Sequence, residues 1–174
     1  MHKAGKALAL VGASAALVGS AVAPSMAAAQ RSDPYTNTHL VKVWGTRPGH
    51  DVCISVGSRE KAAAVIAGCN MHSKYQMWTL KHQYAGGVTT IKNTKTGKCL
   101  GVTAKRSGTV VRQYKCNGSK QQKWALGGSK VHSVYAGYSM VISANTSRSG
   151  QQLTITKSGE SNSARIKQEW GLKK

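Results

Sequence analysis

Short stretches in which apolar and polar residues alternate follow one another along most of this chain. The clearest are residues 87–93, 98–103, 109–115 and 123–126. Clusters of Gly, Asn, Ser and Thr separate them, and short strands bounded by such turn residues are typical of an all-β barrel or sandwich. No window sustains the 3.6-residue apolar period of an amphipathic helix. The pattern therefore predicts an all-β domain.

The same spacing occurs on both sides of this segment. Strands are expected at 40–44, 52–56 and 62–67 before it, and at 130–135, 140–143 and 152–156 after it. With a fourth strand in each of three units, the chain is predicted to contain roughly twelve short strands.

Three Gln-x-Trp triplets define the length of the repeated unit. Their tryptophans stand at 78, 124 and 170, so each step is 46 residues, and a fixed period of this size marks a repeated structural unit. A large ring that recurs at one phase of a threefold repeat is placed to fill a shared core. The glutamine two positions earlier can satisfy buried backbone groups. The residues assigned to this core are Gln76, Trp78, Gln122, Trp124, Gln168 and Trp170.

Residues 1–29 are expected to be a secretory signal peptide, which makes the protein extracellular. Lys3 and Lys6 precede an apolar stretch rich in Ala, Val and Leu, and Ala27-Ala28-Ala29 supplies small residues for cleavage. A membrane anchor is the alternative, although the stretch is near the lower limit for spanning a bilayer. Residues 30–37 would form a short leader. The repeat domain is expected at 38–174, with units at about 38–82, 83–128 and 129–174.

The chain is strongly basic. It carries 25 Lys and Arg against 5 Asp and Glu, a formal net charge of +20, and loss of Lys3 and Lys6 with the signal would leave 20 − 2 = +18. Such an imbalance favours polyanionic partners, although a solvated basic surface is the alternative. The charges are scattered and no aromatic stripe accompanies them, so a dedicated nucleic-acid-binding fold is not expected.

All four cysteines lie in the first two repeats. In an exported protein disulfides are the default, and of the three possible pairings the repeat selects Cys53 with Cys69 and Cys99 with Cys116. No Cys-x2-Cys pair occurs and the histidines follow no ligand spacing, so no metal or other cofactor is expected. Catalysis is not expected either, because the five acids are scattered rather than paired and no Gly-x-Ser-x-Gly elbow is present.

A longer motif spans the second repeat. It reads Asn93-x5-Cys99-Leu100-x-Val102, then Ser107-Gly108-Thr109-x-Val111-x2-Tyr114-x-Cys116-Asn117-Gly118-Ser119-x2-Gln122-x-Trp124. This motif closely resembles a repeat of the ricin B-chain type lectins, and the resemblance extends over roughly residues 38–174. It implies a β-trefoil of three such repeats, each a potential sugar site. In the third repeat Val141 and Ser158 replace the cysteines, so that unit is expected to lack a disulfide.

In that family a sugar site uses four positions. They are an Asp two residues after the first Cys, an amide four residues before the second Cys, an aromatic two residues before it, and an Asn just before the Gln-x-Trp. The second repeat has Gly101, Arg112, Tyr114 and Gln121 there; the first has Ser55, Val65, Ala67 and Tyr75; the third has Ser143, Thr154, Thr156 and Lys167. The acid is missing from all three, which argues against galactose binding of the usual kind.

The second repeat exchanges an anion for a cation. Arg112 offers a fork of donors that matches carboxylate, phosphate or sulfate, while Tyr114 offers a stacking face and Gln121 an amide. With Asn117 in the adjacent turn, these are the candidate carbohydrate-binding residues, and an acidic or phosphorylated glycan is the predicted ligand. The alternative is that Arg112 and Tyr114 are ordinary outward strand residues.

The resemblance and the charge together predict a secreted, monomeric, non-catalytic carbohydrate-binding domain. Its partners would be acidic polysaccharides or teichoic-type cell-wall polymers. Two other functions stay open: a general polyanion binder, and a protein-binding inhibitor or effector, because a fold does not fix a function. Salt separates the first two, since purely ionic binding weakens steeply as salt rises.

Overall fold

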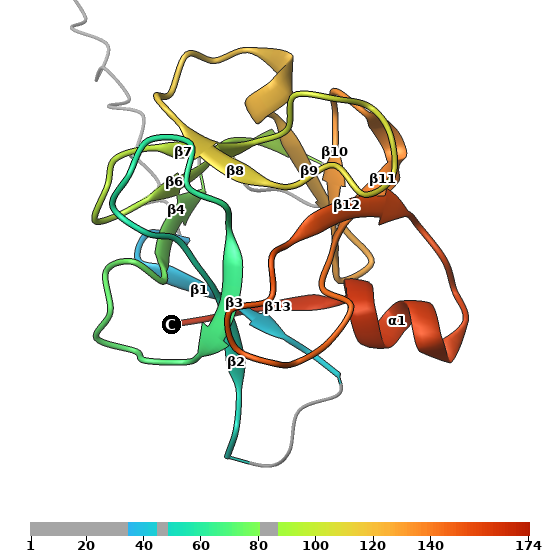
Figure 1. Cartoon of the computed structure of the whole chain (residues 1–174), viewed down its shortest axis with the longest axis horizontal. Helices are drawn as coiled ribbons and strands as arrows, with labels where there is room; N and C mark the ends of the chain where they lie inside the picture. The colour runs from blue at the N-terminus through green and yellow to red at the C-terminus, as the bar shows by residue number, and fades with distance from the viewer. Residues whose placement is uncertain (1–34, 45–48, 81–86) are drawn as a thin grey trace, which may run out of the picture. The chain divides into compact units, whose positions relative to one another are not determined.

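A computed structural model of the chain describes residues 35–44, 49–80 and 87–174 (Figure 1). The signal peptide expected at 1–29 lies outside these residues, as does most of the expected leader. Among the residues that the model describes, no helix is long and apolar enough to cross a bilayer.

The described residues form thirteen short strands, one α-helix and one 3₁₀ helix. The first repeat contributes β1 (Thr38–Lys42), β2 (Val52–Ser55), β3 (Val65–Gly68) and β4 (Met77–Leu80). The second contributes β5 (Val88–Thr89), β6 (Ile91–Asn93), β7 (Cys99–Gly101), β8 (Arg112–Tyr114), η1 (Lys120–Gln122) and β9 (Trp124–Gly127). The third contributes β10 (Lys130–Ser133), β11 (Gly137–Ser143), β12 (Thr154–Lys157), α1 (Asn162–Gln168) and β13 (Trp170–Lys173).

One predicted strand is divided in two. The stretch 87–93 forms β5, which pairs with β9, and β6, which pairs with β4 and β7. Because the two halves bond to different neighbours, the ladder is interrupted at Thr90, and thirteen strands replace the expected twelve.

Three hairpins meet at the threefold axis. β2 pairs with β3, β7 with β8, and β11 with β12, and Figure 1 shows β3, β8 and β12 around one central point. Three backbone hydrogen bonds close a ring there. The Ala64 N–H donates to Val111 O (2.9 Å), the Val111 N–H to Leu153 O (2.9 Å), and the Leu153 N–H to Ala64 O (2.8 Å). All three residues are fully buried, so each hairpin completes its neighbour's hydrogen bonding.

The indoles of the Gln-x-Trp triplets lie in the single hydrophobic core. Trp78 and Trp124 are fully buried and Trp170 is 4% exposed. Each indole N–H donates to a backbone carbonyl of the strand that carries the first cysteine position of its own repeat (β2, β7 or β11): Ile54 at 3.2 Å, Leu100 at 3.0 Å and Ile142 at 3.1 Å, respectively. A buried ring whose polar atom is bonded contributes apolar area without a desolvation penalty.

The two disulfides join Cys53 to Cys69 and Cys99 to Cys116, the pairing that the repeat selects. In the third repeat Val141 lies opposite Thr156 on β12, as Cys99 lies opposite Tyr114 on β8. Val141 therefore takes the place of the first cysteine, and Ser158, two residues beyond Thr156, takes that of the second.

Helix α1 was not expected from the sequence. It occupies the place in the third repeat that η1 occupies in the second, just before the Gln-x-Trp. Ser161 caps it by accepting a hydrogen bond from the Ala164 N–H. A helix of about two turns offers too few positions for a 3.6-residue period to become visible, and of its residues only Gln168 is buried.

Candidate functional site

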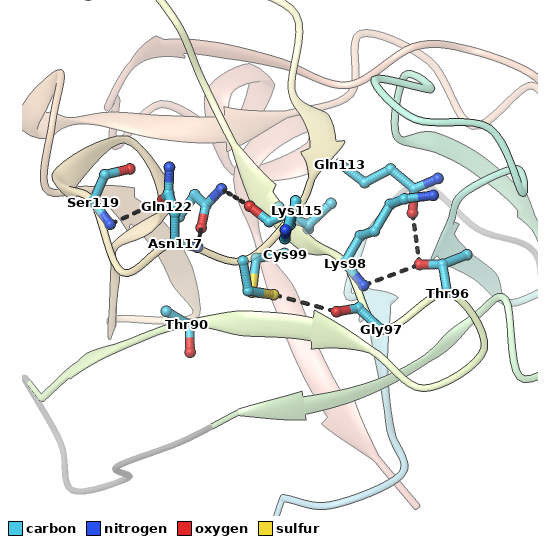
Figure 2. The surroundings of a disulfide bond; sticks show 12 residues. Thr90, Thr96, Gly97, Lys98, Cys99, Gln113, Lys115, Asn117, Ser119 and Gln122 are labelled. Carbon is cyan, nitrogen blue, oxygen red and sulfur yellow. Dashed lines mark hydrogen bonds between the residues drawn. A yellow bond between two sulfur atoms is a disulfide. The ribbon is translucent and has the colours of Figure 1, made fainter.

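The glutamine of each triplet bonds to both sides of the turn at the second cysteine position. In Figure 2 the Gln122 side chain lies beside Lys115 and Asn117. Its Nε2 donates to Lys115 O (2.9 Å), and its Oε1 accepts from the Asn117 N–H (3.0 Å). Gln76 and Gln168 bond in the same way to the residues on either side of Cys69 and Ser158. These amides therefore hold the three turns in equivalent positions.

Asn117 is used inside its own turn. Its Oδ1 accepts from the Ser119 N–H at 3.0 Å, and its N–H bonds to Gln122 (Figure 2). Asn70 makes the equivalent contacts in the first repeat, with Gln76 and His72. The side-chain oxygen of Asn117 therefore has a structural role that the first repeat shares.

The Tyr114 ring and the backbone carbonyl of Gln121 lie close to Gly101. A Cβ at Gly101 would lie 3.0 Å from Gln121 O, 3.2 Å from Gln122 Cγ and 3.3 Å from Tyr114 Cδ2. The Gln121 carbonyl is fixed there because it accepts from the Val102 N–H at 3.1 Å. A backbone carbonyl and a tyrosine ring thus crowd the position where the resemblance expects an acid, so a side chain there would force its neighbours to shift.

Arg112 is bonded to the first repeat. Its Nη1 donates to Lys61 O at 3.0 Å, across the junction between the second and first repeats. It also lines an open surface hollow formed by the β7–β8 connection, together with Arg106, Ser107 and Thr103. Arg106 and Ser107 are exposed. Arg112 thus lines a hollow whose described lining residues include two arginines and no acid, and to which Tyr114 and Gln121 do not contribute.

The corresponding positions of the other two repeats have fewer side chains that could bind a sugar. Val65 and Ala67 of the first repeat have apolar side chains. In the third repeat Ser143 is buried, and Thr156 Oγ1 accepts from Gln168 Nε2 at 3.0 Å. Neither repeat has an aromatic side chain opposite its first cysteine position.

A buried lysine links the first and third repeats. Lys42, at the end of β1, is 2% exposed, and its Nζ donates to Thr146 O (3.1 Å) and Ser147 Oγ (3.2 Å). Burial, with a smaller effect from the nearby Lys167, lowers the pKa of Lys42. A strand lysine has no pattern that would reveal its burial, so sequence reasoning missed it.

An exposed tryptophan is held beside this lysine's strand. Trp44 is 47% exposed, and its Nε1–H donates to Glu169 Oε2. Arg165 of α1 donates from Nε to Glu169 Oε1 (2.7 Å), and its guanidinium carbon lies 5.6 Å from the Trp44 ring centre. The hydrogen bond from Arg165, helped by that from Trp44, lowers the pKa of Glu169, although burial acts in the opposite direction. The sequence signal was the fourth tryptophan, which falls outside the 46-residue step.

Comparisons with known proteins agree on the fold. A family model described as the ricin-type beta-trefoil lectin domain matches residues 42–170. The Polyporus squamosus lectin is similar with a TM-score of 0.63 at 13% identity, over 79% of this chain and 48% of that chain. An agglutinin from Abrus precatorius has a TM-score of 0.61 at 24% identity, over 79% and 48%. The designed threefold-symmetric protein ThreeFoil has a TM-score of 0.57 at 17% identity, over 78% and 96%.

These similarities confirm the β-trefoil expected from the sequence. The chain spans about half the length of the first of these lectins. A search of curated protein sequences found no match.

Proposed function

The chain belongs to the ricin-type β-trefoil lectin family, and on that premise we propose that it is a secreted, non-catalytic carbohydrate-binding domain with a preference for acidic polysaccharides. The family and the lectin neighbours support carbohydrate binding; one of these neighbours, the Polyporus squamosus lectin, was crystallised with a bound glycan that contains Neu5Ac. The two disulfides are consistent with an oxidising, extracellular location.

One observation carries the preference for acidic ligands. The hollow beside β8 is lined by Arg106 and Arg112, with hydroxyls from Thr103, Ser107 and Thr109. A guanidinium presents a planar fork of N–H donors that suits a carboxylate, sulfate or phosphate. Arg112 donates one N–H to Lys61 O. This contact orients the rest of its guanidinium without neutralising its charge.

The proposed ligand is therefore an acidic polymer whose charged group lies against the two arginines. Tyr114 lies on the same strand as Arg112, two residues further along, and is half-buried. Candidate wall polymers of the teichoic type would offer phosphate to the same hollow. The net charge, 20 − 2 = +18 once Lys3 and Lys6 leave with the signal peptide, adds a long-range attraction to any such chain.

The test is binding of polygalacturonate and of neutral galactan, measured by calorimetry at low and high salt. Polygalacturonate should bind more tightly than galactan, and Arg106→Gln with Arg112→Gln should reduce this difference. Arg148→Gln is the matched control, because Arg148 is also an exposed arginine but does not line this hollow. Equal loss in all variants would contradict a defined acidic site.

A general polyanion binder is the second candidate, and the charge of the chain favours it. Such a protein would lose affinity for every polyanion with the same steep salt dependence. It would bind DNA and polygalacturonate alike, and the two hollow arginines would contribute no more than other arginines.

A further inference from the structure

Two departures from threefold symmetry meet at one place on the surface. Lys42, Asn93 and Ser133 are equivalent, because each lies opposite the tryptophan of a triplet. Asn93 Oδ1 accepts from the N–H groups of the two residues at 95 and 96, and Ser133 Oγ accepts from the Ala136 N–H, so both cap the turn that follows. An ammonium group has no acceptor, and Lys42 therefore cannot do this.

The connection after β1 is correspondingly different. Residues 43–51 join β1 to β2, whereas 94–98 join β6 to β7 and 134–136 join β10 to β11. Trp44 is the second residue of this longer connection, and it is bonded to Glu169, directly after helix α1. The helix is the second departure, since the second repeat has only η1 there. Neither feature is needed for the threefold core.

The exposed indole is fixed in position. Its N–H is bonded to a carboxylate that is 7% exposed, and one face lies against the Arg165 guanidinium. Glu169 is the middle residue of the third triplet, where the first two have Met77 and Lys123. It is the one buried acid among the residues that the structure describes. The other tryptophans are 0%, 0% and 4% exposed, against 47% for Trp44.

The residue before Trp44 adds an exposed apolar side chain. Val43 is 44% exposed, and its Cγ2 lies 3.6 Å from the position that a Cβ on Gly171 would take. Gly171 has no side chain to cover the strand beside it. Arg165 remains 45% exposed, so its guanidinium keeps N–H groups directed to solvent beyond the one bonded to Glu169. An exposed aromatic ring and a cationic donor thus lie in contact, and an exposed apolar residue precedes the ring in the chain.

We propose that Trp44, Arg165 and Glu169 form a glycan-binding platform that is separate from the sugar positions of the three repeats. This rests on the proposed function. The C–H face of a pyranose packs on the exposed part of the indole, and the Arg165 N–H groups bind a carboxylate on a neighbouring residue of the same oligomer. Glu169 is a positioning residue, which holds both the indole and the guanidinium. The predicted ligand is a uronic acid oligomer.

Fluorescence can test this directly, because Trp44 is the only one of the four tryptophans that is substantially exposed. Acrylamide should quench the Trp44 emission of the wild-type protein, and oligogalacturonate should protect it. A neutral galacto-oligosaccharide should protect it less. This measurement requires no variant, so it does not depend on a variant being folded.

Variants then separate the platform from the rest of the protein. Trp44→Ala should weaken oligogalacturonate binding about tenfold, the usual size of a lost stacking contact. Trp44→Phe retains a ring but loses the N–H that donates to Glu169, so its affinity for oligogalacturonate should lie between those of the wild type and Trp44→Ala. Tyr138→Ala, which removes another exposed aromatic, is the control and should bind like the wild type. Thermal melting verifies that each variant is folded.

Two results would overturn the proposed platform. One leaves the proposed function intact, and the other contradicts it too. If the wild-type protein binds oligogalacturonate without protecting Trp44, and Trp44→Ala binds equally well, the platform is wrong and the proposed function stands. If the wild-type protein binds no polysaccharide at all, both the platform and the proposed carbohydrate-binding function are wrong.

Discussion

The three triplet glutamines should differ in their contribution to stability, although their geometry is equivalent. Gln122 makes two hydrogen bonds to the turn at Cys116, and Gln168 makes three to the turn at Ser158. At about 1 kcal/mol net for each bond, Gln122→Leu should cost about 2 kcal/mol and Gln168→Leu about 3 kcal/mol.

The disulfides should widen this difference. Cys99–Cys116 closes a loop with a sequence separation of 17, a constraint worth about 3 kcal/mol in the loop-entropy model. It holds the second-repeat turn in place after its amide is lost, so the turn can rebond to water with little rearrangement. The third-repeat turn has no such constraint, because Val141 and Ser158 cannot be joined.

Equilibrium unfolding in guanidinium chloride measures both effects. Gln76→Leu, whose turn also carries a disulfide, should resemble Gln122→Leu. Removing Cys99 and Cys116 together should raise the cost of Gln122→Leu toward that of Gln168→Leu. Equal costs in all three repeats, or a Gln122→Leu cost that ignores the disulfide, would refute the idea that amide and disulfide hold the same turn.

Three further outcomes follow from the same structure. Gly101→Asp should destabilise the protein by about 1–3 kcal/mol in thermal or chemical unfolding and should not create galactose binding, because a Cβ there would lie 3.0 Å from Gln121 O and 3.3 Å from the Tyr114 ring, which would have to shift; a stable, galactose-binding variant would contradict this. The pKa of Lys42 is lowered on folding from 10.5, so the unfolded state binds more protons and stability should rise with pH toward that value; Lys42→Met should lose this rise, as melting temperatures at alkaline pH would show. The pKa of Glu169 is lowered from 4.5, so its contribution is present above that pH and lost as the pH falls through the folded value; Glu169→Gln should flatten the acid side of the stability profile, and an unchanged slope would show that this carboxylate is not coupled to folding.

Sequence reasoning located the repeats well and the irregular elements poorly. Turn residues and alternation marked the hairpins, because a strand with one face in the core must alternate. The ends of strands shifted by a few residues, since pairing partners decide where a ladder stops. Helix α1 and the division of 87–93 into β5 and β6 were not visible, because both depend on neighbours from other parts of the chain.

In the candidate site, too, sequence reasoning missed contacts that depend on distant parts of the chain. Arg112, Tyr114 and Gln121 stand at the sequence positions of the family's site, yet Arg112 donates to Lys61 O and lines a hollow to which Tyr114 and Gln121 do not contribute. Lys61 lies 51 residues away along the chain. No local pattern gives the direction of a long side chain whose partner belongs to another repeat.

By itself the sequence determined the threefold β architecture and the pairing of the cysteines. Its 46-residue period requires each unit to bury its indole against the other two, and a repeat that cannot bury its core alone admits few arrangements. The tertiary structure alone decided which surfaces are open. It joined Trp44 to Glu169 across 125 residues, because β1 and β13, from the two ends of the domain, pair side by side. It also closed the space at Gly101 with groups from two other segments. The contacts of exposed side chains depend on such packing between distant segments, whereas the core residues recur in every repeat and can be recognised from the sequence.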